Sequence, residues 1–147
     1  MPLVAIVGSL LVTALFVAGI AFISWQKQKT QQILAATGSL DARVRAKGML
    51  RVFGLECPAV ALATDDELIL HPLVGRVRRI PLAHIVLKQE TPGIGPYAWW
   101  GKRMFHLECP EERLLVLGFA DPAPWRTVFQ SRPTSIAPHP LEYQKPS

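Results

Sequence analysis

The chain has 147 residues, half of them hydrophobic, and its 16 Lys and Arg against 11 Asp and Glu give a formal net charge of +5. This length allows one small domain, and the apolar content is ordinary for a globular protein. Two cysteines are fewer than a disulfide-built secreted domain would carry. Because the chain contains no asparagine, N-glycosylation is excluded.

The first expected element is a membrane-spanning helix, because no charged residue or histidine occurs from Pro2 to Trp25. More than twenty such residues, at about 1.5 Å each, can cross roughly 30 Å of hydrocarbon. Trp25, Lys27 and Lys29 follow in the order expected of an anchor at a headgroup interface. A cleavable signal peptide is the alternative, with Gly19-Ile20-Ala21 as a weak cleavage site. The apolar core of a signal peptide is usually shorter than this segment and is preceded by basic residues.

The charge distribution predicts the orientation of this span. Basic side chains are absent before it and follow it from Lys27 onward, which places the N-terminus outside and the rest of the chain in the cytoplasm. Within the span, Ala14, Ala18 and Ala21 lie on one helix face, and small residues allow another helix to approach closely. This face predicts lateral packing against a membrane partner, with a generic single span as the alternative.

We expect four regions: a transmembrane helix at 1–26, a helical juxtamembrane linker at 27–44, a β domain at 45–132 and a disordered proline-rich tail at 133–147. Good helix formers continue the span up to Ala36, and Gly38 ends it. A second short helix over Asp41–Lys47 would be capped by Ser39 or Asp41. The tail has too few apolar residues to pack.

From Met49 the apolar residues recur with the period of a strand. Polar corners at 64–66 and 110–112 and a turn at 81–84 separate the predicted strands. In the last hairpin we expect five apolar side chains to face one another in the core: Phe105 and Leu107 against Leu115, Leu117 and Phe119.

A short helix is expected after the strands, with Asp121 as its N-cap and Pro122 as its first residue. Trp125, Val128 and Phe129 would form its apolar face. The element order predicts a small, mostly β domain, an antiparallel sandwich or partly open barrel of about seven strands capped by the C-terminal helix.

Two motifs resemble the bacterial pleckstrin-homology-like and GRAM-like domains. They are Thr64-Asp65-Asp66-Glu67-Leu68 and Ile80-Pro81-Leu82-Ala83-His84-Ile85, separated by a basic strand. The closing strand "LLVLGF" and a helix with Trp125 fit the same plan, so the resemblance covers about residues 45–132. It implies a non-enzymatic module of two packed sheets and a helix. Bacterial relatives are often joined to membrane spans, and one occurs in an assembly factor for photosynthetic complexes. The expected location is therefore a bacterial inner membrane.

Three arginines, Arg76, Arg78 and Arg79, occupy four positions of this segment. On a strand, Arg76 and Arg78 would share one face, but Val74 and Ile80 have the same parity, so simple alternation fails. A bulge or a strand end near Arg78-Arg79 would resolve the conflict. The cluster is either a solvated strand face or a contact for an anionic headgroup or an acidic protein. Eukaryotic relatives bind phosphoinositides through the loop between their first two strands, so that site does not transfer to this cluster.

A second candidate surface is the Gly- and Pro-rich loop at 91–103. Aromatic and apolar side chains beside cations suit a membrane interface or a protein contact. Alternatively, Trp99 and Trp100 begin a strand, and one of them is core. The residues in question are Ile94, Tyr97, Trp99 and Trp100, followed by the cations Lys102 and Arg103.

No catalytic, metal or cofactor site is expected. Leu-Glu-Cys-Pro occurs at 55–58 and 107–110, without the closely spaced ligands of a zinc site. His71, His84 and His106 are scattered and lack a nucleophile motif. Signatures of nucleic-acid binding are also absent, and no small-molecule substrate is expected.

The expected partners are membrane lipid and other membrane-protein subunits. The sequence predicts a membrane-anchored, non-enzymatic binding or scaffolding module. The alternative is a small accessory or assembly subunit of a transport, respiratory or photosynthetic membrane complex.

Overall fold

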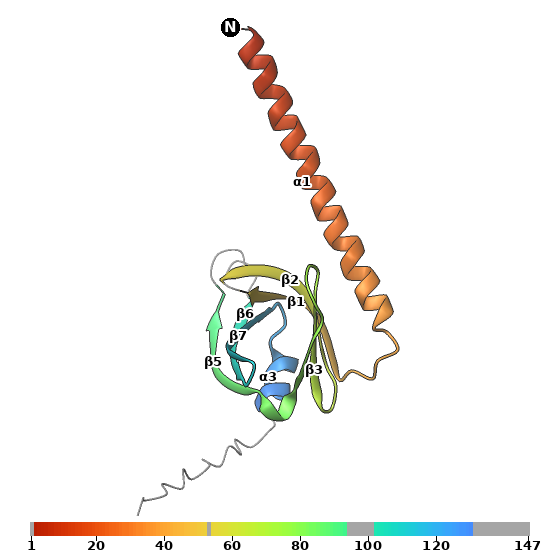
Figure 1. Ribbon diagram of the computed structural model, residues 1–147, viewed down its shortest axis with the longest axis vertical. Coiled ribbons are helices and arrows are strands. Elements are labelled where there is room, and N and C mark those ends of the chain that lie inside the picture. Colours follow the sequence, from red (N-terminus) through yellow and green to blue (C-terminus); the bar gives the residue numbers. More distant parts are fainter. Residues whose placement is uncertain (1, 53, 94–101, 131–147) are drawn as a thin grey trace, which may run out of the picture.

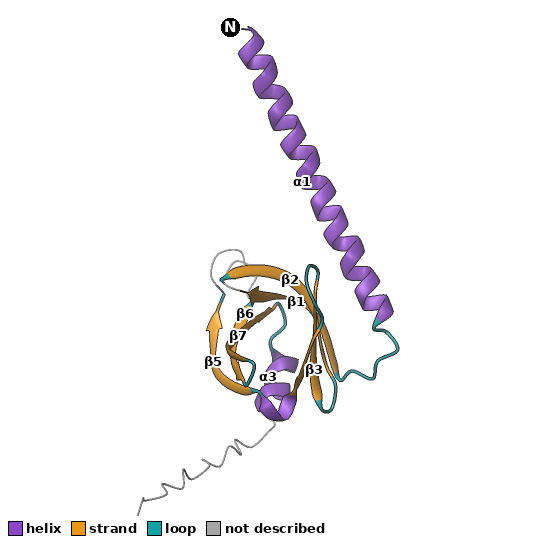
Figure 2. Cartoon of the chain, in the orientation of Figure 1, coloured by secondary structure: helices purple, strands orange, loops and turns teal. Residues whose placement is uncertain are grey.

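The computed structural model describes residues 2–52, 54–93 and 102–130. Figure 1 shows a long helix beside a small β domain, and Figure 2 shows the strands curled around a short C-terminal helix. The helices are α1 (Pro2–Ala36), the 3-10 helix η1 (Leu82–His84) and α3 (Ala123–Gln130). The strands are β1 (Val44–Val52), β2 (Leu55–Ala63), β3 (Glu67–Pro72), β4 (Arg78–Pro81), β5 (Val86–Pro92), β6 (Arg103–Cys109) and β7 (Glu112–Phe119).

The seven strands form one antiparallel sheet in the order β4-β3-β2-β1-β7-β6-β5. Most neighbours in the sheet are also neighbours in the chain, and the exception is the pairing of β1 with β7 through Gly48–Arg51 and Val116–Phe119. The sheet curls into a partly open barrel with β4 and β5 at its edges. This confirms the predicted fold class: an apolar N-terminal helix, a seven-stranded β domain and a C-terminal helix.

Gly48 permits the close approach of β1 to β7. A Cβ atom at this position would lie 2.6 Å from the carbonyl oxygen of Gly118 and 2.8 Å from the ring of Phe119. Both distances are shorter than van der Waals contact, and one partner is backbone that cannot rotate away. Joining the first strand to the last therefore requires a residue without a side chain at position 48.

The barrel interior contains the apolar residues predicted for the last hairpin. In the register of β6 and β7, Phe105 lies opposite Leu117 and Leu107 opposite Leu115. These four side chains are at most 1% exposed, and Phe119 belongs to the same cluster. The prediction that these apolar side chains face one another in the core is confirmed.

Helix α3 closes one end of the barrel. Trp125 is fully buried and stacks on Phe119 with ring centroids 4.1 Å apart, while the Phe129 ring lies 5.4 Å from that of Phe105. Val128 is partly buried against the same cluster, as predicted. Asp121 Oδ1 accepts a hydrogen bond from the backbone N–H of Ala123 at 3.2 Å, so the cap forms, although the helix begins one residue later than predicted.

Helix α1 continues to Ala36, as predicted, and is long and apolar enough to span a membrane. The predicted second helix over Asp41–Lys47 is wrong. Strand β1 already begins at Val44 and pairs with β2 along its whole length, from Val44 opposite Ala63 to Val52 opposite Leu55. The hydrogen bonds of this ladder outweigh the weak local helix preference of the segment.

Candidate functional site

The arginine cluster lies where the chain re-enters the sheet. Strand β4 begins only at Arg78, so Arg76 belongs to the connection between β3 and β4, and a left-handed Gly75 with φ of +114° helps to turn this connection. A strand end, one of the two predicted solutions, therefore resolves the parity conflict. Arg78 lies opposite Leu70 and Arg79 opposite Ile69.

This register sends the two neighbouring arginines to opposite faces of the sheet. Leu70 belongs to the barrel core and Ile69 to a separate cluster on the outer face. Residues paired across an antiparallel ladder point to the same side. Arg78 therefore faces the inside of the barrel and Arg79 the outside, as the predicted alternation of these two residues requires.

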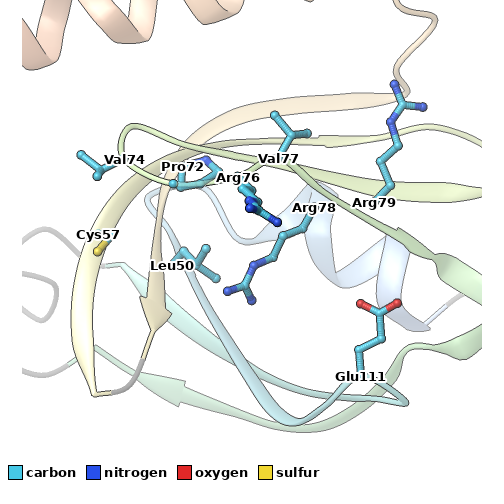
Figure 3. Close-up of a pocket in the computed structure, with 10 residues that line it drawn as sticks. Leu50, Cys57, Pro72, Val74, Arg76, Val77, Arg78, Arg79 and Glu111 are labelled. Carbon is cyan, nitrogen blue, oxygen red and sulfur yellow. The ribbon is translucent and has the colours of Figure 1, made fainter.

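Arg76 and Arg78 point into a pocket of about 640 Å³ (Figure 3). Arg79 also borders this pocket, but its guanidinium points away from it, and Glu111 lies across the pocket from the arginines. Two guanidinium groups converging on one cavity can hold an anion through several charge-assisted hydrogen bonds. The remaining walls are mainly apolar and include Leu50, Cys57, Pro72, Val74 and Val77.

On the outer face, Arg79 has structural partners. Its Nη1 lies 3.4 Å from Oε2 of Glu67 across the β3–β4 pair. Burial and then the positive charge of Arg79 lower the pKa of His71. His71 is consequently neutral at physiological pH and adds no positive charge to the arginine cluster.

Arg103 lies in a second charged cluster, centred on Glu90 and separate from the pocket. Arg126 of α3 donates to Glu90 from Nε at 2.7 Å and from Nη2 at 2.5 Å, and Arg103 donates from Nε at 3.0 Å. The hydrogen bond from Arg126 is the main cause that lowers the pKa of Glu90 to about 2, and the hydrogen bond from Arg103 has a smaller effect in the same direction. This cluster fastens α3 to β5 and β6, so the guanidinium of Arg103 serves the fold.

The second predicted surface lies mostly outside the described residues. Ile94, Tyr97, Trp99 and Trp100 fall in the range 94–101. Lys102 is described and half-buried, and its carbonyl oxygen accepts a hydrogen bond from the N–H of Gly93 at 3.2 Å.

The predicted anchor residues lie together on α1. Phe22 and Trp25 stack with ring centroids 5.8 Å apart, and Lys29 Nζ lies 5.4 Å from the centroid of the Trp25 ring. Lys27 and the alanines at 14, 18 and 21 are exposed on the same helix. In the part of the chain that the structure describes, no protein segment covers this apolar half of α1.

Sequence reasoning found the arginines but not the walls of their pocket. Leu50 and Cys57 come from β1 and β2, and Glu111 from the turn between β6 and β7. Only the assembled sheet brings these segments together. Within residues 2–52, 54–93 and 102–130, no three His, Cys, Asp or Glu side chains are grouped as a metal site.

Comparison of the chain with known proteins adds no family assignment. No protein-family model, no curated protein and no solved structure matches it.

Proposed function

We propose that this protein is a membrane-anchored, non-enzymatic binding module that holds an anionic group between Arg76 and Arg78. Helix α1 anchors the chain in a bacterial inner membrane, with its N-terminus outside and the β domain in the cytoplasm. The domain is of the pleckstrin-homology-like kind, as its sequence motifs at 64–68 and 80–85 suggest. A fluorescent protein fused to the C-terminus tests the orientation, because such a protein should fluoresce only if it stays in the cytoplasm.

The observation that carries this proposal is the direction of the two guanidinium groups into one pocket with otherwise mainly apolar walls. Arginine suits phosphate and carboxylate groups because its planar fork donates two parallel hydrogen bonds. An anionic lipid or an acidic side chain of a protein partner would satisfy this chemistry.

The proposal predicts that Arg76→Gln with Arg78→Gln weakens anion binding by about tenfold to a hundredfold, since hydrogen bonds between charged groups contribute about 1.5–3 kcal/mol. The full chain in dodecyl maltoside micelles is titrated with dihexanoyl phosphatidylglycerol and followed by microscale thermophoresis. Dihexanoyl phosphatidylcholine serves as the lipid without net charge.

The control is Arg43→Gln with Lys88→Gln, which removes the same charge from residues paired with Asp65 and Glu108. This control should bind phosphatidylglycerol as the unchanged protein does. Equal weakening in both double variants would mean that net charge, and not the pocket, determines binding. The proposal would then be wrong.

A second function is favoured by the exposed surface of α1. The face with Ala14, Ala18 and Ala21 is uncovered, and small residues permit close packing with another membrane helix. On this alternative the protein is an accessory or assembly subunit of a membrane complex. It would then co-purify in fixed ratio with other subunits in mild detergent, even as the Arg76→Gln, Arg78→Gln variant. Ala18→Leu should reduce that ratio.

A further inference from the structure

The end of α1 is tied to the β domain at a buried corner. Thr37 is 4% exposed, and its hydroxyl donates a hydrogen bond to the carbonyl oxygen of Ile33 at 2.7 Å. Arg45, on β1, donates from Nη2 to the carbonyl oxygens of Thr37 at 2.7 Å and Leu40 at 3.2 Å. A cation at the C-terminal end of a helix satisfies free carbonyl groups and interacts favourably with the helix dipole. The corner therefore fixes the direction in which the chain leaves α1.

A small apolar cluster on the outer face of the sheet reinforces this corner. Val60, Leu62 and Ile69 of β2 and β3 are at most 2% exposed. The residues packed against them are the last turn of α1 and the segment that follows it: Ile33, Leu34, Leu40 and Ala42. The final turn of α1 is consequently part of the domain's packing. A domain held in this way keeps one orientation relative to the membrane segment of the same helix.

The orientation points the arginine end of the domain toward the membrane. In Figure 1 the connection between β3 and β4 and the start of β2 lie at the end of the domain nearer to the N-terminal part of α1. Helices η1 and α3 lie at the opposite end. Arg76 and the adjoining wall of the pocket belong to that β3–β4 connection.

The same end exposes large apolar side chains to solvent. Val74 is 71% exposed and Val77 is 51% exposed on either side of Arg76, and Leu55, the first residue of β2, is 71% exposed. Exposure of these apolar side chains to water is unfavourable, whereas at a bilayer surface they can enter the boundary between headgroups and acyl chains. Arg76 beside them would reach the phosphate level, where each basic residue contributes about 1 kcal/mol on an anionic leaflet.

We infer that the domain docks on the leaflet that its own α1 spans, with Val74 and Val77 in the interface and the phosphate of an anionic lipid of that bilayer between Arg76 and Arg78. This inference rests on the proposed anion-binding function of the pocket and assigns the anion to the membrane. The tether makes such a lipid available at high local concentration, because the corner at Thr37 keeps the pocket beside the bilayer.

The test is depth-dependent quenching in the full chain, reconstituted in nanodiscs. An environment-sensitive nitrobenzoxadiazole dye is attached at Val74→Cys or, as the control, at Ala83→Cys in η1 at the opposite end of the domain. Both variants carry Cys57→Ser, and Cys109 stays because it is only 5% exposed. Lipids with a nitroxide on a shallow acyl carbon should quench position 74 by about twofold and leave position 83 unchanged.

Changing the lipid composition of the nanodiscs and adding inorganic phosphate distinguish a lipid phosphate from free phosphate as the bound anion. Quenching at position 74 should rise when phosphatidylglycerol is added to phosphatidylcholine nanodiscs, and Arg76→Gln with Arg78→Gln should abolish this rise. Equal quenching at positions 74 and 83 would overturn the docking. A response to inorganic phosphate, with none to phosphatidylglycerol, would overturn the assignment to lipid. In either case, arginine-dependent binding of phosphatidylglycerol in micelles would leave the proposed function standing. An absence of such binding in micelles would overturn the proposed function, and with it the assignment of a lipid phosphate to the pocket.

Discussion

Trp125→Ala should destabilise the β domain by about 3–5 kcal/mol, the usual cost of removing a large aromatic side chain from a core. The indole is fully buried between the barrel and α3, and it stacks on Phe119 at 4.1 Å. Since small domains are stable by only about 5–15 kcal/mol, such a loss would leave a substantial fraction unfolded under mild denaturing conditions.

Urea unfolding of the full chain in micelles, followed by far-ultraviolet circular dichroism, measures this effect. The β signal reports the domain, while the signal of α1 in detergent provides an internal reference. Thr127→Ala is the matched control, because Thr127 is exposed on the same helix. A Trp125→Ala variant that unfolds at the urea concentration of the unchanged protein would show that α3 is not part of the folded core.

Glu90→Gln is expected to lower the free energy of unfolding by about 1–2 kcal/mol at pH 7, because two guanidinium groups lose their shared carboxylate. The side chain of Glu90 is 16% exposed, but those of Arg103 and Arg126 are 39% exposed, so solvent screening keeps the effect in this lower range.

The pH dependence of the free energy of unfolding shows whether the Glu90 carboxylate makes this contribution. Folding lowers the pKa of Glu90 from about 4.5 to about 2, so the folded state favours the ionised form. Its contribution is complete above pH 4.5 and is lost as the pH falls toward 2. The difference between the unchanged protein and Glu90→Gln should therefore close over this range. Glu67→Gln, at a more exposed ion pair, should show a smaller difference at pH 7, and a gap for Glu90→Gln that persists at pH 2 would contradict the assignment.

Much of the fold could be predicted from the sequence, because its signals are local. Alternation in the β6–β7 hairpin predicted which side chains of the two strands face one another in the core, and the spacing of Trp125 and Phe129 predicted the buried face of α3. The start of β1 could not be predicted in this way. Residues 41–47 have a mixed pattern that suits a short helix, and only pairing with β2 makes part of this segment a strand.

The candidate site was only partly predictable for the same reason. The parity conflict at Arg78-Arg79 pointed to a bulge or a strand end, since alternation is a local property, and the structure has a strand end. The contacts that decide the role of each charge are long-range. Glu90 and Arg126 are 36 residues apart, and Glu111 approaches the pocket only through the folded sheet. No pattern of spacing along the chain encodes such pairs.

The tie between Arg45 and the end of α1 also makes the segment from Trp25 to Thr37 a spacer with a fixed length and a fixed helical phase. One inserted residue would turn the domain by about 100° around the helix axis and move it by about 1.5 Å, so the domain would lie beside another face of α1 at nearly the same height above the bilayer. Four inserted residues would nearly restore the original rotation of the domain around the helix axis, but they would move the domain by about 6 Å along that axis. Because docking on the leaflet depends on the height of the domain, a whole inserted turn should weaken the docking more than a single inserted residue does.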